Sequence, residues 1–241
     1  MRILISGASR GIGRSLVSEA LALGFEVDAI VRKAEDAPPG CTVHVLDVTD
    51  HEAIAQLMHT LAPLLDCYIA NAGVGDTLNP RKADSGDRAV RQIQINTTST
   101  IYSCYRIAFE WIELGLRDRR IAMVSSLGAG RGFPSNSVYI ASKTALISFA
   151  QGFEIDLAKH GIGVSLILPG FVDTDMTAHL KSKPFSVKPA AAARIILNGI
   201  ERKKFWIAFP FPIIWMARFR DFIPYFLFRW IVTGMQKLKW V

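Results

Sequence analysis

Tyr139 and Lys143 stand four residues apart in the run Tyr-Ile-Ala-Ser-Lys, which is the spacing of one helical turn. A phenol beside an ammonium group can exchange a proton with a carbonyl or alcohol oxygen, because the neighbouring cation stabilises the phenolate. A pair at this spacing is also common on ordinary solvated helix surfaces. The two residues therefore predict proton-transfer chemistry only if other functional groups lie near them.

Two polar residues earlier in the chain supply such groups. Ser126 follows an expected strand over 121–125, and its hydroxyl can donate a hydrogen bond to an oxygen on which negative charge develops. Asn96 lies in an expected helical stretch over 95–105. Ligands of parallel sheets bind at the carboxyl ends of the strands, so Ser126 is placed where a substrate would lie.

Three glycines, Gly7, Gly11 and Gly13, lie between an expected strand over 3–6 and an expected helix over 14–23. In this context glycines let the chain turn sharply and direct backbone N–H groups toward a pyrophosphate at the helix N-terminus. A tight strand-to-helix turn requires glycine even without a ligand, so the triplet alone leaves both interpretations open.

Apolar runs of strand length alternate with helical patterns along the chain. Runs that are apolar on both faces are typical of a parallel sheet covered by helices on each side. The pattern predicts an α/β fold, a single-domain Rossmann-type doubly wound parallel sheet with helices on both faces. The expected strands cover 3–6, 27–31, 43–46, 67–70, 121–125 and 164–168, and clear helical patterns cover 14–23, 53–61 and 139–159.

Motifs along the chain resemble, in type and order, those of the short-chain dehydrogenase/reductase family, and the resemblance extends to about Phe209. The segment 6–13 is similar to the family's cofactor loop, with serine at its first position where threonine is more usual. Three further segments are similar to cofactor motifs of the family: 47–48 (Asp-Val), 71–73 (Asn-Ala-Gly) and 169–174 (Pro-Gly-Phe-Val-Asp-Thr).

The resemblance implies a catalytic set of Asn96, Ser126, Tyr139 and Lys143. Lys143, together with the positive nicotinamide ring of the oxidised complex, is expected to lower the pKa of Tyr139. Lys143 is also expected to bind the nicotinamide ribose, and Asn96 to hold a water that links Lys143 to solvent. The expected cofactor-binding residues are Gly7, Ser9, Arg10, Gly11, Ile12, Gly13, Arg32, Asp47, Val48, Asn71, Ala72, Gly73, Tyr139, Lys143, Pro169, Gly170, Val172 and Thr174.

The end of the second expected strand indicates which dinucleotide binds. An acidic residue about 20 residues after the glycines usually bonds the ribose 2′-hydroxyl of NAD, but Val31 occupies that place here. Arg32 follows it and Arg10 lies in the glycine loop, so two guanidinium groups can converge on a 2′-phosphate. This arrangement favours NADP. Asp28 lies inside the strand, and the sequence assigns it no role.

The resemblance also implies assembly into a homodimer or homotetramer, built on helices around 96–114 and 139–159. The related, longer nucleotide-sugar epimerases carry an additional substrate domain. The chain after Pro169 offers no counterpart to that domain, which argues against an epimerase.

Composition narrows the class of protein further. The chain has 241 residues and a formal net charge of +7, which a basic C-terminal tail on an otherwise balanced enzyme explains without nucleic-acid binding. Its three cysteines lack disulfide or zinc spacing and its five histidines lack metal-ligand spacing, so we expect reduced thiols and no metal. No secretory signal pattern opens the chain, which predicts a cytoplasmic location.

The stretch 210–241 departs from the family pattern and is predicted to form two amphipathic helices broken at Pro224. Its charges argue against a membrane span, which needs about 20 apolar residues. One interpretation packs these helices over the substrate pocket or at a subunit interface; the other lays them in a membrane interface, with Lys237 and Lys239 near anionic lipid. The predicted apolar faces hold Trp215, Phe219 and Phe222, then Leu227, Trp230 and Ile231; the opposing polar residues are Arg218 and Asp221, then Arg229, Thr233 and Gln236.

These observations predict an NADP(H)-dependent oxidoreductase that interconverts a carbonyl and an alcohol on a lipophilic small molecule. Residues 1–209 would form the dinucleotide-binding and catalytic domain, and 210–241 an apolar extension. The alternative is an NADP-binding, membrane-peripheral regulatory or scaffold protein of the same fold. The intact set of Ser126, Tyr139 and Lys143 argues against that alternative.

Overall fold

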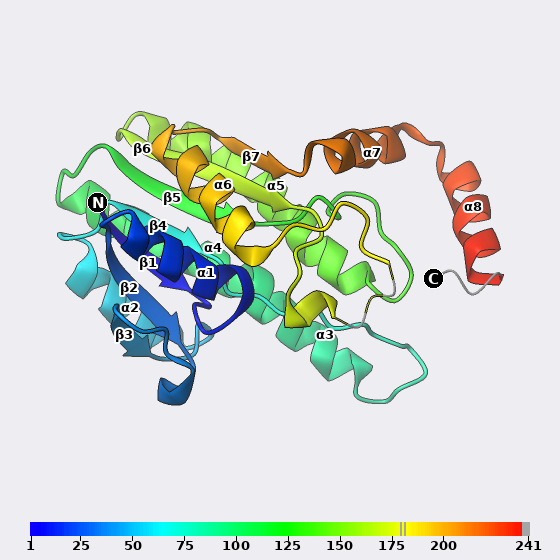
Figure 1. The fold of residues 1–241 in the computed structure, drawn as a ribbon, viewed down its shortest axis with the longest axis horizontal. Coiled ribbons are helices and arrows are strands. Elements are labelled where there is room, and N and C mark those ends of the chain that lie inside the picture. Colours follow the sequence, from blue (N-terminus) through cyan, green and yellow to red (C-terminus); the bar gives the residue numbers. More distant parts are fainter. Residues whose placement is uncertain (179, 181, 238–241) are drawn as a thin grey trace.

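The computed structural model describes residues 1–178, 180 and 182–237, without the side chains of 216–218, 220, 221 and 235–237. Its centre is a sheet of seven parallel strands in the order β3-β2-β1-β4-β5-β6-β7 (Figure 1). The predicted doubly wound parallel sheet is confirmed. The strands are β1 (Arg2–Ser6), β2 (Glu26–Val31), β3 (Thr42–Val45), β4 (Cys67–Ala70), β5 (Arg119–Val124), β6 (Ile162–Pro169) and β7 (Trp206–Phe209).

Helices cover both faces of this sheet (Figure 1). On one face, α1 (Gly11–Ala22) packs beside α6 (Pro189–Glu201). The other face is covered by α2 (His51–Leu61), α4 (Ser99–Glu113) and α5 (Ser137–Ala158). Each layer encloses a hydrophobic core of its own, with the sheet between them.

Two stretches outside these layers matter for the site and the surface. The helix α3 (Ser85–Ile93) continues through a π-helix (Gln94–Thr98) into α4. At the other end of the chain, α7 (Phe211–Phe222) and α8 (Tyr225–Lys237) form the two predicted helices and extend away from the sheet (Figure 1). Within the described residues, no helix has the length and apolar character needed to cross a membrane. Short 3₁₀ helices cover Ala34–Asp36 and Asp175–Thr177.

Several predictions about the C-terminal charges fall outside what the structure describes. Lys239 is among the residues that are not described, and so are the side chains of Arg218, Asp221, Gln236 and Lys237.

Strand residues explain why the sheet is buried on both sides. In β1, Ile3 and Ile5 pack into the core beneath α1 and α6, whereas Leu4 packs into the opposite core. Successive side chains of a strand point to opposite faces, so a strand buried on both faces is apolar at every position. The sequence predicted six strands by this criterion and missed β7. The aromatic run that contains β7 fits the start of an amphipathic helix equally well.

Asp28, to which the sequence assigns no role, is a structural residue of β2. It is 1% exposed, and its carboxylate accepts a hydrogen bond from Arg2 Nε at 2.7 Å and lies 2.8 Å from His44 Nε2. Burial would raise the pKa of Asp28, but the bonds from His44 and Arg2 hold it below the usual value. The carboxylate thus links β1, β2 and β3, and it is already paired.

Candidate active site

A cavity opens at the carboxyl ends of β1, β2, β4, β5 and β6. The strand order reverses between β1 and β4 at this edge, which is where doubly wound sheets bind ligands. Every residue of the predicted cofactor set lines the cavity, and so does Ser126, whereas Asn96 is buried behind its wall. Lining residues outside the predicted cofactor and catalytic sets are Ile30, Val31, Leu46, Val74, Ile95, Val124, Ser125, Asp175, Met176 and Thr177.

The glycine loop is fastened to the end of β4 by Asn71. Asn71 Nδ2 donates hydrogen bonds to the carbonyl oxygens of Ser6 at 3.0 Å and Gly7 at 3.1 Å. Ser6 Oγ in turn accepts from the N–H groups of Asn71 at 3.0 Å and Ala72 at 3.1 Å. Gly7 has a φ of +66°, and a Cβ on Gly13 would lie 2.2 Å from the Gly7 oxygen. Neither position accepts a larger residue without moving the loop.

The first turn of α1 offers a place for an anion. Gly11, Ile12 and Gly13 line the cavity, Arg10 at the N-cap makes no side-chain cap, and the first turn holds no acidic residue. The N–H groups and the positive end of a helix dipole together stabilise a negative charge at such a terminus. The residues present therefore fit the pyrophosphate of a dinucleotide.

Lys143 is buried in α5 with its ammonium group at the end of β5. The residue is 5% exposed, and Nζ donates to the Val124 carbonyl at 2.8 Å. Ser125 Oγ donates to the Lys143 carbonyl at 2.7 Å and so joins this turn of α5 to the strand end. Burial lowers the pKa of Lys143 to about 8. An amine that titrates close to neutral pH is suited to pass on a proton.

Asn96 is fully buried in the π-helix, a rare geometry that occurs often at functional sites. Its Oδ1 accepts from the Val74 N–H at 2.8 Å, and its Nδ2 donates to the Val74 carbonyl at 2.9 Å and to Ser142 Oγ at 3.0 Å. A Cβ on Gly73 would lie 3.3 Å from both Asn96 Oδ1 and Lys143 Nζ. The small residue Gly73 thus leaves a space bordered by an amide oxygen and an ammonium group.

The residues that hold Asn96 in place were missed by the sequence analysis. Val74 acts through its backbone, and Ser142 is a serine inside a helix, so neither carries a signal in a single sequence. Gln92, one turn before Asn96, is also fully buried, with Nε2 3.5 Å from the Val74 carbonyl. Among the described residues, its Oε1 has no hydrogen-bond partner.

Tyr139 and Ser126 meet at the cavity wall, where their side chains form a hydrogen bond. Ser126 Oγ also accepts from the Gly128 N–H at 3.0 Å. Burial raises the pKa of Tyr139 above its usual value, and the bond from Ser126 offsets this only in part. The structure therefore differs from the expected lowering of this pKa by Lys143, because desolvation of the phenol outweighs the stabilisation of its charge.

Arg32 and Asp47 lie at the opposite end of the cavity, after β2 and β3. Burial would raise the pKa of Asp47, but hydrogen bonds from Thr49 and the charges of Arg32 and Arg91 hold it below the usual value. Arg10 lines the same cavity from the glycine loop, and both Arg10 and Arg32 are exposed. The two predicted guanidinium groups therefore border one cavity.

The sequence profile of the family described as short chain dehydrogenase matches residues 1–184, which is more than half of the chain. The chain belongs to the short-chain dehydrogenase family. It is an oxidoreductase by that membership, as the sequence predicted.

Individual known proteins are similar to this chain over most of its length. An uncharacterized oxidoreductase of Myxococcus xanthus (strain DK1622) is 31% identical over 240 residues, covering 93% of both chains. A sorbitol dehydrogenase of Cereibacter sphaeroides is 33% identical over 181 residues, covering 70% of both. The crystal structure of a short chain dehydrogenase from Burkholderia cenocepacia J2315, in complex with NADP, has the same fold, with a TM-score of 0.81 and 24% identity. The match covers 92% of this chain and 98% of that one.

The buried charge in this short-chain dehydrogenase has a measurable cost. Burial lowers the pKa of Lys143 from 10.5 to about 8, so between these values the unfolded chain binds more protons and stability rises with pH. Replacing Lys143 with methionine removes a penalty of about 3 kcal/mol and loses a hydrogen bond worth about 1 kcal/mol. We expect Lys143→Met to be more stable than the wild type by about 2 kcal/mol at neutral pH, with the difference shrinking as pH rises through this window.

Urea unfolding of the wild type and Lys143→Met across this pH range measures the effect. Lys159→Met is the matched control, because Lys159 is exposed at the end of the same helix. Equal pH dependence in all three proteins would show that the Lys143 ammonium is not buried as described.

Proposed function

We propose that this protein is an NADP(H)-dependent oxidoreductase that interconverts a carbonyl and an alcohol on a lipophilic small molecule. The observation that carries the proposal is the hydrogen bond between Tyr139 and Ser126 at the wall of the cavity that the glycine loop lines. The Tyr139 hydroxyl, the Ser126 hydroxyl and the predicted dinucleotide-binding residues therefore line the same cavity. The proposal names Tyr139 as the general acid and base.

The cavity supports NADP as the preferred dinucleotide. The pyrophosphate would lie at the N-terminus of α1, and Arg10 and Arg32 would bind the 2′-phosphate with forked donors. Asp28 is the acidic residue of β2 that lies nearest in sequence to Val31, and it is paired with Arg2 and His44. The structurally similar Burkholderia protein was solved with NADP, which agrees with this preference. When bound, the nicotinamide supplies or accepts the hydride.

Tyr139 and Ser126 would act on the substrate oxygen. In the direction of reduction, the Tyr139 hydroxyl donates its proton to this oxygen as negative charge develops there, and Ser126 donates a hydrogen bond to the same atom. In the reverse direction the Tyr139 phenolate takes the proton of the alcohol. The raised pKa keeps Tyr139 protonated at neutral pH, which is the form that reduction requires.

Lys143 and Asn96 would return the proton to solvent. The space beside Gly73 is bordered by Lys143 Nζ and Asn96 Oδ1. A water in this space would accept a hydrogen bond from the ammonium group and donate one to the amide oxygen, which still has a free lone pair. We therefore assign Asn96 the role of holding a water next to Lys143.

The residues beside Tyr139 support an apolar substrate. Val74 and Met176 line the cavity. A Cβ on Gly75 would lie 3.2 Å from Met176 Sδ and 3.7 Å from Tyr139 Cε2, so the thioether and the phenol ring border the same small space. Apolar walls with few polar groups favour a lipophilic aldehyde, ketone or alcohol.

The substitution Tyr139→Phe tests the reaction. It keeps the ring and removes the proton donor, so we expect NADPH binding to stay unchanged and turnover of lipophilic aldehydes and ketones to fall by about 100-fold or more. Nicotinamide fluorescence reports binding, and NADPH oxidation reports turnover. Tyr102→Phe, on α4 and outside the residues that line the cavity, is the control. Full turnover by Tyr139→Phe would sink the assignment of Tyr139 as the general acid and base, whereas a wild type that binds NADPH without turning over any carbonyl would favour an NADP-binding regulatory or scaffold protein.

The two arginines are tested by titration with NADPH and NADH. We expect the wild type to bind NADPH more tightly, and Arg10→Ala and Arg32→Ala each to weaken NADPH binding by about tenfold with little effect on NADH, because each removes a charged hydrogen bond to the 2′-phosphate. Lys33→Ala is the matched control, since this neighbouring side chain is 68% exposed and lies 3.5 Å from Glu35. A preference for NADH would show that the arginines serve another purpose.

We also propose a homodimer or homotetramer built on α4 and α5. Tyr105 is 54% and Phe109 is 49% exposed on α4, and the Tyr105 ring packs against Phe149 and Phe153 of α5. Exposed aromatic residues that continue a hydrophobic core are typical of a subunit interface.

Acidic residues introduced at Tyr105 and Phe109 of α4 should separate the subunits. Tyr105→Glu combined with Phe109→Glu is expected to give a monomer in sedimentation velocity, because two buried carboxylates per chain would lose their solvation in the interface. Leu23→Glu, at an equally exposed position after α1, should leave the assembly unchanged. A wild-type monomer at micromolar concentration would contradict this proposal.

A further inference from the structure

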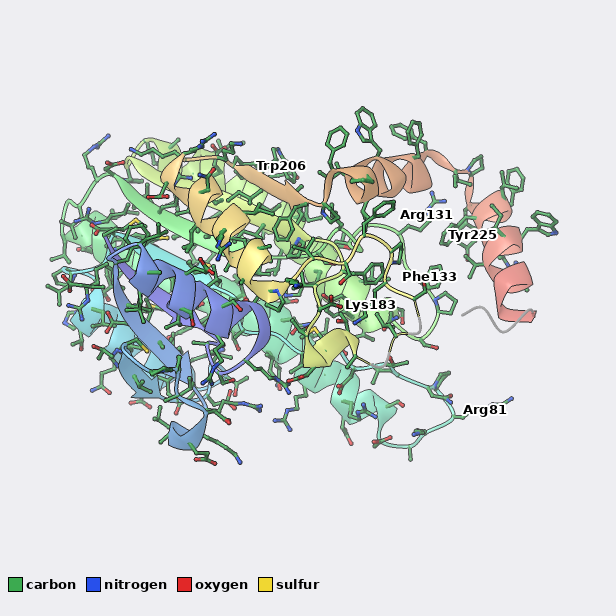
Figure 2. All side chains as sticks on the ribbon, viewed as in Figure 1. Arg81, Arg131, Phe133, Lys183, Trp206 and Tyr225 are labelled. Atoms are coloured by element: carbon green, nitrogen blue, oxygen red, sulfur yellow. The ribbon has the colours of Figure 1, made fainter. Side chains whose placement is uncertain are left out.

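The outer sides of α7 and α8 carry a set of exposed aromatic rings. Phe219 is 66% and Phe222 is 85% exposed on α7, and Phe226 is 76% and Trp230 is 74% exposed on α8. Figure 2 shows rings standing off both helices on the side away from the sheet, with Tyr225 at the start of α8. We call these residues the aromatic face: Trp215, Phe219, Phe222, Tyr225, Phe226 and Trp230.

The inner sides of the same helices are already occupied. Ile213 and Ile214 of α7 pack against the core beneath β7. On α8, Phe228 is 9% and Val232 is 6% exposed, and the Phe228 ring lies 6.4 Å from that of Phe133. The helices are therefore anchored through one side, and the aromatic face has no contact with the rest of the described chain that would account for its composition.

The loop between Ser126 and Tyr139 provides the anchor for α8. The Arg131 guanidinium lies 5.0 Å from the centre of the Phe228 ring and donates a hydrogen bond to the Ile223 carbonyl. Arg131 and Phe133, from this loop, are close to α8 in Figure 2. The aromatic face is thus held in a fixed orientation and not merely left unpacked.

The charge of this part of the chain indicates what covers the face. Residues 211–241 contain five Lys and Arg and one Asp, a net +4 out of +7 for the whole chain. The remaining 210 residues are nearly balanced. Two copies meeting through this face would bring like charges together, whereas an anionic surface would be attracted.

The residue types of the aromatic face indicate more closely which kind of partner binds it. Trp, Tyr and Phe are the side chains that settle at the boundary between lipid headgroups and acyl chains, and Lys and Arg beside them bind anionic headgroups. Exposed aromatic patches on a soluble surface mark a binding site. None of the described helices is long and apolar enough to span the bilayer. The contact that we consider is therefore with the membrane surface.

We propose that the aromatic face of α7 and α8 docks into the headgroup region of an anionic lipid membrane. The rings of the bend between the two helices enter the interface, and the basic residues of 211–241 attract the anionic headgroups. Docking turns the side of the protein that carries the loop between Ser126 and Tyr139 toward the membrane, with α8 between this loop and the membrane surface. A lipophilic substrate dissolved in the bilayer would then lie on the same side of the protein as this loop; this last step rests on the proposed function, but the docking does not.

Vesicle flotation of the full-length protein tests the docking. The probes are vesicles of phosphatidylcholine alone and of phosphatidylcholine mixed with phosphatidylglycerol, without NADPH or substrate. We expect the wild type to float with the mixed vesicles, and raised salt to weaken this binding. The emission of Trp215 and Trp230 should shift to the blue and be quenched by brominated lipid, since these rings would leave water.

The double variant Phe219→Ser/Phe222→Ser should bind the mixed vesicles about tenfold more weakly or worse, because two interfacial rings are lost. Leu23→Ser/Leu64→Ser removes two exposed leucines far from this face and should bind like the wild type. Both variants should retain the wild-type affinity for NADPH, which would show that they fold. A loss of vesicle binding can then be told apart from a failure of the proposed reaction.

Two outcomes would overturn the proposal. One is a wild type that fails to float with mixed vesicles at low salt, or a Phe219→Ser/Phe222→Ser variant that floats equally well. The other is a concentration-dependent dimer without lipid that this variant dissociates, which would show that a second copy covers the face.

Discussion

A cation without an ionic partner is the constraint around which the site is arranged. The Lys143 ammonium is buried, and among the residues that the structure describes no carboxylate forms an ion pair with it. A buried charge must be stabilised by oriented dipoles or lose its proton. The Val124 carbonyl supplies one such dipole, Asn96 Oδ1 borders the same space, and Gly73 keeps that space open. The need to stabilise this buried ammonium group therefore limits which residues can surround Lys143, whether or not a substrate is bound.

The parallel sheet brings the other functional groups to this cation. Ser6 and Val124 are the last residues of β1 and β5, and Asn71 directly follows β4. Parallel pairing puts these three strand ends, which are far apart in the sequence, at one edge of the sheet. The hydrogen bonds of Asn71 to the first loop then fix the distance between the α1 N-terminus and the end of β4. These bonds hold the first loop against the end of β4, beside the cavity wall at which Ser126 and Tyr139 meet.

The sequence was sufficient for the features that depend on local pattern. Strand periodicity predicted six of the seven strands, and the motif residues all reach the cavity or, for Asn96, the layer behind it. The features that the sequence did not predict depend on contacts between residues that are far apart in the sequence. Asp28 is explained only by its pairing with Arg2 and His44. Likewise the direction of the Tyr139 pKa follows from burial, which no spacing of four residues specifies.

The C-terminal extension and the active-site loop are energetically linked. Burying Phe228 and Val232 is worth roughly 3–6 kcal/mol together, and part of that burial is against Phe133, in the loop that separates Ser126 from Tyr139. Displacing α8 would therefore cost several kcal/mol and would uncover this loop. The loop in turn holds Ser126 through Gly128, whose N–H donates to the Ser126 hydroxyl. Since the outer side of α8 is exposed while its inner side supports this loop, α8 joins the exposed aromatic face to the loop whose Gly128 N–H holds the Ser126 hydroxyl.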